Sequence, residues 1–223
     1  SRVSARSTAA TAVRTIMEST EGVVDVDQCG KSYVPMDFAL PAQPVPEGLD
    51  WEMWVGPAPW WPYCKARVHM NWRWNYNIGG GQLLDWIGHH CDIAHWGMNC
   101  DDTGPVEIEG RGVYPKDGIY DVPTEYQFTC KYANGVEMVV ANDRQVPKGM
   151  GTVWYGEKGW VHVDRSGINA HPKELLNIQW GPNDTKLYES RNHARNLLDC
   201  VRSRKDTICP IDVAVQADTL CQI

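Results

Sequence analysis

What the chain lacks excludes several classes of protein. It has no excess of basic residues, since 21 Lys and Arg stand against 28 Asp and Glu and give a formal net charge of −7. This balance argues against binding to nucleic acid or to an anionic membrane surface. No apolar run approaches the roughly 20 residues that a bilayer-spanning helix requires, and no apolar stretch of a signal peptide follows residues 1–7. The scattered cysteines described next, which we expect to be reduced, favour a cytoplasmic protein.

The cysteines lack the paired spacing of a metal site. They stand at positions 29, 64, 91, 100, 130, 200, 209 and 221, with no Cys-x-x-Cys among them. A structural zinc ion is therefore not expected. A chain of this length does not need disulfides to hold a core, and Cys91 and Cys200 fall in helical patterns, where a thiol packs as a small apolar group. We expect reduced thiols.

Phenylalanine is scarce, with two residues, whereas tryptophan is abundant, with eleven. An indole has an apolar face and one N–H donor, and it can stack on a sugar ring. We expect most tryptophans to fill the core and a few to line a pocket. Residues 35–63 combine four tryptophans with seven prolines, a composition unsuited to regular helix or central strand. We expect a long ordered loop there that wraps over the domain.

The rest of the chain alternates helical and strand patterns. Helices are expected over residues 5–19, 81–98 and 190–202 and from Pro210 onward; a strand that is at an edge or half-buried is expected over 23–28, another strand over 106–112, and hairpins over 124–140 and 152–164. In the helix over 190–202, the apolar side consists of Ala194, Leu197, Leu198 and Val201. This order predicts one α+β domain over residues 1–223, an open, mostly antiparallel sheet with helices packed on one face.

The second strand of the first hairpin has apolar residues on both sides, at Val136, Met138, Val139 and Val140. A sheet that helices cover on one face only would need another partner on its open face. We therefore expect a homo-oligomer that forms through the open face of the sheet.

The most informative segment is residues 79–96. Three glycines at 79–81 open it and suit a chain that passes close to a neighbouring backbone or to a cofactor. The helix that follows places Asp85, His89 and Asp92 at i, i+4 and i+7, so their side chains share one side. A carboxylate beside an imidazole can fix the ring tautomer and take part in proton transfer. The pattern favours Asp85 and His89 as a catalytic pair.

A polar and aromatic patch precedes this helix. Arg73 stands between Trp72 and Trp74, close to Tyr76. A guanidinium group binds a hydroxyl pair or a carboxylate, and an indole stacks on a sugar. We expect Arg73 and Trp74 to contact a substrate; the alternative is that the tryptophans only pack under the sheet.

Other interpretations of the helix stay open. Asp85 and His89 also fit an ion pair on a helix surface. A metal site would need His90 or His95 beside His89, but neither gives the i, i+4 spacing of two histidines that bind zinc from one helix. No metal is predicted.

The pattern Gly-Gly-Gly-x-Leu-x-Asp-x-x-x-His-x-x-Asp-x-x-x-Trp over residues 79–96 resembles the second, substrate-binding domain of the glucose–fructose oxidoreductase / inositol dehydrogenase (Gfo/Idh/MocA) family. Further segments resemble a Trp-rich bacterial branch of that family: residues 44–51, 54–60, 71–74, 156–160, 193–196 and 200–203. The matching segments lie within residues 35–220.

The resemblance implies the substrate-binding and catalytic half of an NAD- or NADP-dependent oxidoreductase that acts on a sugar, a polyol or a related hydroxy compound. By the family motif, Asp85 and His89 are the catalytic pair, with His89 as general base, and Asp92 contacts the substrate. His193 lies on the helix expected over residues 190–202, which lies near the site in the family, so it is a further candidate substrate contact. The expected partner is a carbohydrate-like small molecule.

The chain departs from the family pattern at its beginning. It has no Gly-x-Gly-x-x-Gly fingerprint after a strand and no Glu-Lys-Pro motif. We therefore expect residues 1–34 to be the junction with a missing nucleotide-binding domain, and we expect no cofactor bound by the chain alone. The alternatives are a cofactor-less carbohydrate-binding or scaffolding module, and a non-redox lyase or hydrolase that uses Asp85 and His89.

Overall fold

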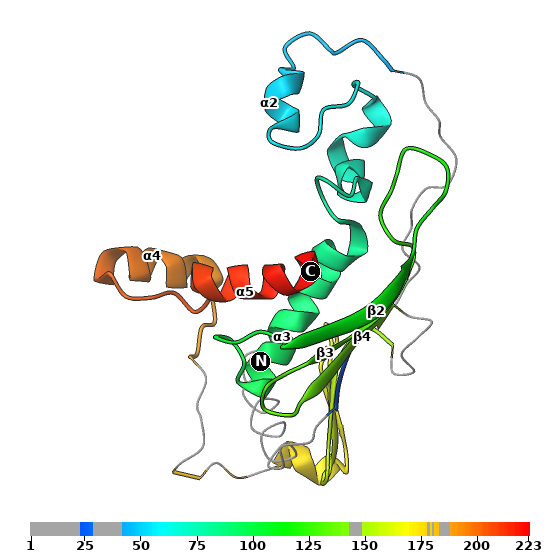
Figure 1. The fold of residues 1–223 in the computed structure, drawn as a ribbon. Helices are drawn as coiled ribbons and strands as arrows, with labels where there is room; N and C mark the ends of the chain where they lie inside the picture. Colours follow the sequence, from blue (N-terminus) through cyan, green and yellow to red (C-terminus); the bar gives the residue numbers. More distant parts are fainter. Residues whose placement is uncertain (1–22, 29–41, 143–148, 178, 180, 183–187) are drawn as a thin grey trace.

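The computed structural model describes residues 42–142, 149–177, 179, 181–182 and 188–223, and the backbone of residues 23–28. In this part of the chain one sheet has the strand order β2-β3-β4-β1-β5-β6-β7 (Figure 1). The strands are β1 (Val23–Gln28), β2 (Glu107–Val113), β3 (Glu125–Lys131), β4 (Glu137–Asn142), β5 (Gly151–Gly156), β6 (Gly159–Val163) and β7 (Ile168–His171). Only the β1–β4 pair among these is parallel. The expected α+β fold with an open, mostly antiparallel sheet is confirmed.

β1 lies in the centre of the sheet and not at its edge. It runs parallel to β4, with Val23 opposite Glu137, and antiparallel to β5, with Val23 opposite Tyr155. Its alternating apolar and acidic residues predicted a strand that is at an edge or half-buried. Alternation shows that the two faces of a strand differ in polarity, but it does not show how many strands pair with it. The edges of the described sheet are β2 and β7.

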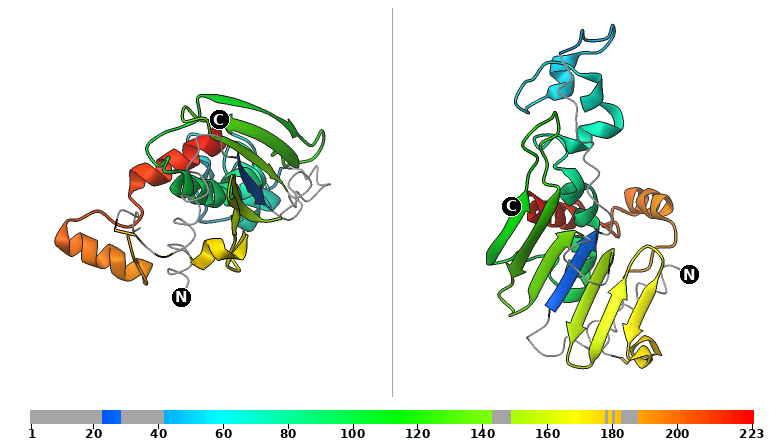
Figure 2. Two further views of the ribbon diagram at one scale, coloured as in Figure 1. Left: turned by 90° about the horizontal axis from the view of Figure 1, so that it is seen from below. Right: turned by 90° about the vertical axis from the view of Figure 1, so that its right-hand side faces the viewer.

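Helices pack on one face of this sheet (Figures 1 and 2). The long helix begins at Gly81 and ends at Met98, as predicted; its first part contains η3 (Leu83–Ile87) and the rest is α3 (Gly88–Met98). α5 (Ile211–Gln222) crosses α3, and α3 packs on β1 and β5. Their shared core includes the buried side chains of Ile87, Cys91, Ala94, Cys130, Met138, Val140, Trp154 and Leu220. No helix in the described residues is long and apolar enough to cross a membrane.

Both predicted hairpins are confirmed, because their turns are local features. In the first, Lys131 pairs with Glu137 across a turn in which Gly135 has a φ of 86°. In the second, Gly156 pairs with Gly159. The sequence did not predict β7 or the short helix η4 (Lys173–Asn177) that follows it.

Residues 42–76 form a lobe above the sheet rather than a simple loop (Figure 1). They contain the short helix α2 (Trp51–Val55), where no helix was predicted, and the 3₁₀ helices η1 (Lys65–Arg67) and η2 (His69–Trp74). Asp50 caps α2 by accepting a hydrogen bond from the N–H of Met53 at 3.0 Å. Trp51 stacks on Trp54 with ring centroids 4.7 Å apart. These contacts give the lobe a small core of its own. The prediction that most tryptophans fill the core is wrong for the described residues, because only Trp51 and Trp154 are buried.

α4 (His193–Ser203) differs from the expectation in the surface that it buries. The predicted apolar side, at Ala194, Leu197, Leu198 and Val201, is exposed to solvent in the described chain. The helix is held instead by Asn196 and Cys200, its buried residues. Helical periodicity located the apolar side correctly, but it does not determine which side packs against the domain.

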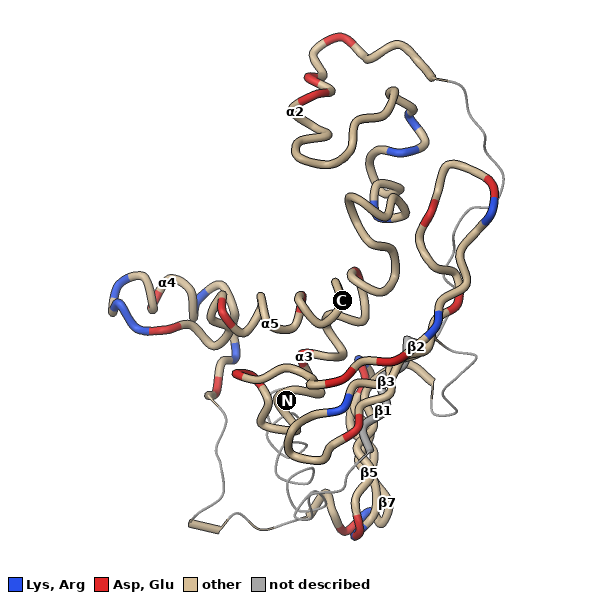
Figure 3. Tube along the Cα trace, viewed as in Figure 1, with Lys and Arg blue, Asp and Glu red and all other residues tan. Residues whose placement is uncertain are grey.

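The open face of the sheet is polar at the end formed by β2, β3 and β4. Met138 and Val140 point to the helices and are fully buried. Glu137 and Val139 alternate with them on the other face, where Val139 pairs with Thr129 and Glu137 with Lys131. Charged residues line β2 (Figure 3). β4 therefore offers less apolar open surface than the sequence suggested, and the homo-oligomer stays a prediction.

Seven of the eight cysteines fall in the described residues, and all seven are free thiols. Cys91 is completely buried and Cys200 is nearly so, as expected of small core residues. The helix predicted over residues 5–19 and most of the junction predicted over residues 1–34 lie outside the described residues.

Candidate active site

The segment before the long helix packs closely on its neighbours. A Cβ at Gly79 would lie 2.3 Å from the Cα of Arg73, and one at Gly81 would lie 2.8 Å from the Val122 side chain. Gly80 and Gly81 also have φ values of 60° and 72°, which favour glycine. The predicted close approach to a neighbouring backbone is present here, and it brings Arg73 to the beginning of the helix.

The first turns of the helix depart from α geometry. Residues 83–87 form a π turn, η3, in which the backbone bonds run from i to i+5. Asp85 and Trp86 lie in this wider turn, and His89 lies in the first turn of α3. Turns of this kind are rare and are found frequently at functional sites.

Asp85 forms an ion pair with Arg73. The Nε of Arg73 donates to Oδ2 of Asp85 at 3.0 Å, and the two side chains are 19% and 35% exposed. A second nitrogen of Arg73 donates to the carbonyl of Met70, and the guanidinium lies 5.3 Å from the ring centroid of Trp72. Arg73 was predicted as a substrate contact, and its pairing with Asp85 was not predicted. The pair leaves a carboxylate fixed in place and still accessible to water.

His89 is exposed on the same helix. Its ring meets the ring of Trp86 nearly at a right angle, 84°, with centroids 6.2 Å apart. A cation also lies over the ring of Trp86, since the guanidinium carbon of Arg165 is 5.0 Å from the ring centroid. In the described residues no hydrogen bond joins Asp85 to His89: the recorded partner of Asp85 is Arg73. Because the π turn lies between Asp85 and His89, the i, i+4 spacing of a regular α-helix does not fix the separation of these two side chains.

The other predicted site residues lie in different surroundings. Asp92 is partly buried on α3. It lies near Cys209: the burial of the Cys209 thiol raises the pKa of that thiol, and the negative charge of Asp92 raises it further. Trp74 packs on a small core formed by Cys64, Ile119, Tyr120 and Val122. His193 is exposed on α4, which Figures 1 and 2 show at the end of α5 that lies away from η3.

The histidines considered for a metal site are core residues. His95 is 2% exposed and its Nε2 lies 2.7 Å from the hydroxyl of Tyr132. Burial lowers the pKa of His95 to about 4. His90 is equally buried. No group of three His, Cys, Asp or Glu that could hold a metal occurs among the described residues.

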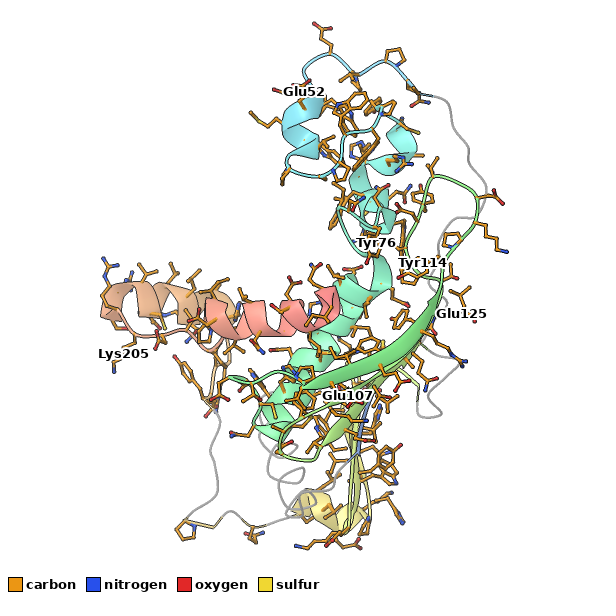
Figure 4. All side chains as sticks on the ribbon, in the orientation of Figure 1. Glu52, Tyr76, Glu107, Tyr114, Glu125 and Lys205 are labelled. Carbon is orange, nitrogen blue, oxygen red and sulfur yellow. The ribbon has the colours of Figure 1, made fainter. Side chains whose placement is uncertain are left out.

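Sequence reasoning placed Tyr76 in the patch around Arg73, but it did not find the aromatic neighbour of Tyr76, which is Tyr114. Figure 4 shows them side by side between the lobe and the end of β2. Both are about half exposed, and their ring centroids lie 6.3 Å apart. The N–H of Tyr76 donates to Oδ1 of Asp121 at 2.6 Å, which ties the lobe to the loop before β3. Only the position of Tyr76, three residues after Arg73, could have indicated this pair.

The sequence matches the model of the oxidoreductase family, C-terminal alpha/beta domain, over residues 31–207. The chain therefore belongs to the Gfo/Idh/MocA oxidoreductases and corresponds to their C-terminal domain. None of the curated proteins matches this sequence.

Solved structures share the fold at low sequence identity. The aldose–aldose oxidoreductase of Caulobacter crescentus, complexed with glycerol, is 14% identical, with a TM-score of 0.56, over 99% of this chain and 58% of its own. An oxidoreductase domain protein of Kribbella flavida is 16% identical, with a TM-score of 0.55, over 99% of this chain and 60% of its own. The WlbA dehydrogenase of Bordetella pertussis, in complex with NADH and UDP-GlcNAcA, is 12% identical, with a TM-score of 0.52, over 96% of this chain and 55% of its own. The chain thus spans less than two thirds of these relatives.

Proposed function

We propose that this chain is the substrate-binding and catalytic half of an NAD(P)-dependent oxidoreductase that acts on a sugar, a polyol or a related hydroxy compound. The observation that carries the proposal is the arrangement on the long helix: a carboxylate, Asp85, held by Arg73 at a π turn, and an exposed imidazole, His89, one turn further on. Family membership supports the class of reaction, and the relatives that are complexed with NADH support the class of cofactor.

In this proposal His89 removes the proton of the substrate hydroxyl group as the carbon that bears it is oxidised; a bound dinucleotide would accept the hydride from that carbon. Asp85, fixed by Arg73, accepts a hydrogen bond from a hydroxyl group and orients the substrate between itself and His89. Asp92, one turn beyond His89, is a further candidate contact. The dinucleotide supplies the hydride acceptor; no residue of the described chain is assigned to hold it.

The proposal is tested first with the reading frame expressed together with its native flanking sequence. Oxidation of aldoses and polyols is followed through the absorbance of the reduced nicotinamide. We expect turnover, and we expect His89→Ala to lower kcat by about 100-fold or more, the usual contribution of a general base. Turnover that is unchanged in His89→Ala would disprove the assigned base.

The second measurement uses the 223-residue chain alone. We expect no saturable binding of NAD(H) at micromolar concentration, and weak binding of sugars detected by saturation-transfer NMR. Saturable dinucleotide binding by the chain alone would contradict the proposal that this chain supplies only the substrate-binding half of the enzyme.

A carbohydrate-binding module without redox activity is the second candidate, and the exposed rings of Trp72, Tyr76 and Tyr114 near Arg73 favour it. A binder should keep most of its sugar affinity in His89→Ala, since aromatic stacking and not proton transfer would hold the ligand. Loss of turnover with retained affinity would instead assign His89 to catalysis.

A further inference from the structure

His89 lies at the end of a row of three side chains from two distant segments. Arg165, in the turn between β6 and β7, places its guanidinium carbon 5.0 Å from the ring centroid of Trp86. Trp86 then meets His89 at 84°, with ring centroids 6.2 Å apart. A cation over an indole face and a perpendicular pair of rings are both favourable geometries. The row therefore has a preferred arrangement at each contact.

The turn that carries Arg165 is held by Asp164. Its Oδ1 accepts hydrogen bonds from the N–H groups of Ser166 and Gly167, at 2.7 and 2.9 Å. The N–H of Asp164 in turn donates to the carbonyl of Gly167 at 3.0 Å. Partial burial alone would raise the pKa of Asp164, but hydrogen bonds from the hydroxyl of Ser166 and from the N–H groups of Gly167 and Ser166 lower it, so the carboxylate stays charged and keeps the turn closed. Arg165 is thus presented from a fixed backbone.

The sheet that carries this turn is tied to the helix that carries His89. Thr152 of β5 pairs with Val163, the last residue of β6 before the turn. The hydroxyl of Thr152 donates to the carbonyl of His90 at 3.0 Å. The ring of His90 lies 6.4 Å from that of Trp86, at 48°. Trp86 is therefore bounded by Arg165 and by two histidine rings.

We infer that Trp86 and Arg165 are positioning residues that set the ring orientation of His89. The inference rests on the proposed role of His89 as the base. His89 is exposed, and an exposed side chain must lose rotamer freedom before it can act in one geometry. Contact with Trp86 restricts that freedom in advance, and Arg165 keeps Trp86 from turning away. Neither residue needs to touch the substrate.

The spectroscopic test uses the chain itself, labelled at histidine. A nuclear Overhauser effect between the rings of His89 and Trp86 should be present, should weaken in Arg165→Gln, and should recover in Arg165→Lys, which keeps the cation. Arg191→Gln is the matched control, since Arg191 is an exposed arginine that pairs with Glu189 outside the site. If the effect is as strong in Arg165→Gln as in the unchanged chain, the inference is wrong.

The kinetic test uses the active protein of the preceding section. Arg165→Gln should lower kcat about three- to fivefold, as expected from losing one exposed cation–π contact, while KM stays unchanged and the Tm falls by no more than about 2–4 °C. Trp86→Leu should lower kcat about tenfold and Trp86→Phe should recover part of it. A rise in KM or a fall in Tm, without a fall in kcat, would assign a binding or a structural role and overturn the inference.

The two proposals fail separately. If His89→Ala retains turnover, the proposed base is wrong, whereas the Overhauser measurement still decides whether Arg165 orients the ring. If His89→Ala abolishes turnover and Arg165→Gln changes neither kcat nor the Overhauser effect, the oxidoreductase stands and the positioning role is disproved. Trp86→Leu is not decisive if it unfolds the chain, and the exposed Arg165 series then carries the test.

Discussion

α3 and α4 are helices of eleven residues each, but α3 buries apolar residues together with His90 and His95, whereas α4 buries only Asn196 and Cys200. α3 buries small and apolar residues against the sheet, among them Cys91, Ala94 and Met98. α4 turns its leucines to solvent, with Leu197 and Leu198 more than half exposed. The comparison shows that a pattern of apolar residues identifies the apolar side of a helix, whereas the surrounding elements determine whether that side is buried.

The anchoring of α4 explains the difference. The amide of Asn196 donates to the hydroxyl of Tyr188 at 2.6 Å, and its carbonyl oxygen accepts from the N–H of Ile208 at 3.0 Å. The thiol of Cys200 donates to the carbonyl of Asp206 at 3.2 Å. Three polar contacts to the adjoining segments therefore hold this helix, and they need none of its leucines.

The largest expected loss of stability is at Ile87, the last residue of η3, directly before α3. Ile87 is completely buried, so Ile87→Ala should cost about 2–5 kcal/mol of unfolding free energy, through lost burial and a residual cavity. Urea denaturation measures this cost. Ile87→Val is the matched control and should cost about 0.5–1.5 kcal/mol; a cost below that of the valine variant would show that the site is not packed as described.

The second expected effect is a loss of stability at low pH, which arises from His95 on α3. Burial lowers the pKa of His95 to about 4 from 6.5. Below the higher value the unfolded chain binds a proton that the folded chain does not, so stability falls as pH drops from about 6.5 towards 4. The loss by pH 5 should be about 2 kcal/mol relative to neutral pH.

Denaturation at several pH values checks this expectation. The pH dependence should become shallower in His95→Gln, because the titrating group is gone. His193→Gln, at an exposed position of α4, should leave the slope unchanged. An equal slope in the native chain and in His95→Gln would mean that other groups account for the acid sensitivity.

A smaller effect is expected at the N-terminus of α4. The side chain of Asn192 accepts a hydrogen bond from the N–H of Arg195 at 2.8 Å. Asn192→Ala should cost about 1 kcal/mol, and Asn192→Asp should cost much less because it keeps the acceptor. Hydrogen exchange of the first α4 amides gives the local measurement. Equal protection in both variants would show that the cap does not stabilise the helix.

The smallest effect is expected on the exposed side of α4. Leu198→Gln should change the unfolding free energy by no more than about 0.5 kcal/mol, since the leucine is already in water. The measurement is the same urea titration as for Ile87. A loss near that of Ile87→Ala would mean that α4 packs through its leucines in solution, and would remove the contrast between the two helices.

Prediction from the sequence succeeded where the determining contacts are local. The Asn134-Gly135 turn defined a hairpin, and the spacing of Asp85 and His89 placed both on one helix. It failed where contacts join distant segments. Nothing near Trp86 indicates that Arg165 will lie over its ring, because that contact depends on the register of β5 and β6.

The sequence by itself determined the long helix, the two hairpins and the family, because each depends on short-range patterns or on a motif within one segment. Only the tertiary structure decided that β1 lies centrally, that Arg73 pairs with Asp85, and that α4 leaves its leucines exposed. The physical reason is that the pattern of a strand or helix determines which way its side chains point. The free energy of burying those side chains depends on which other elements of the fold pack against them.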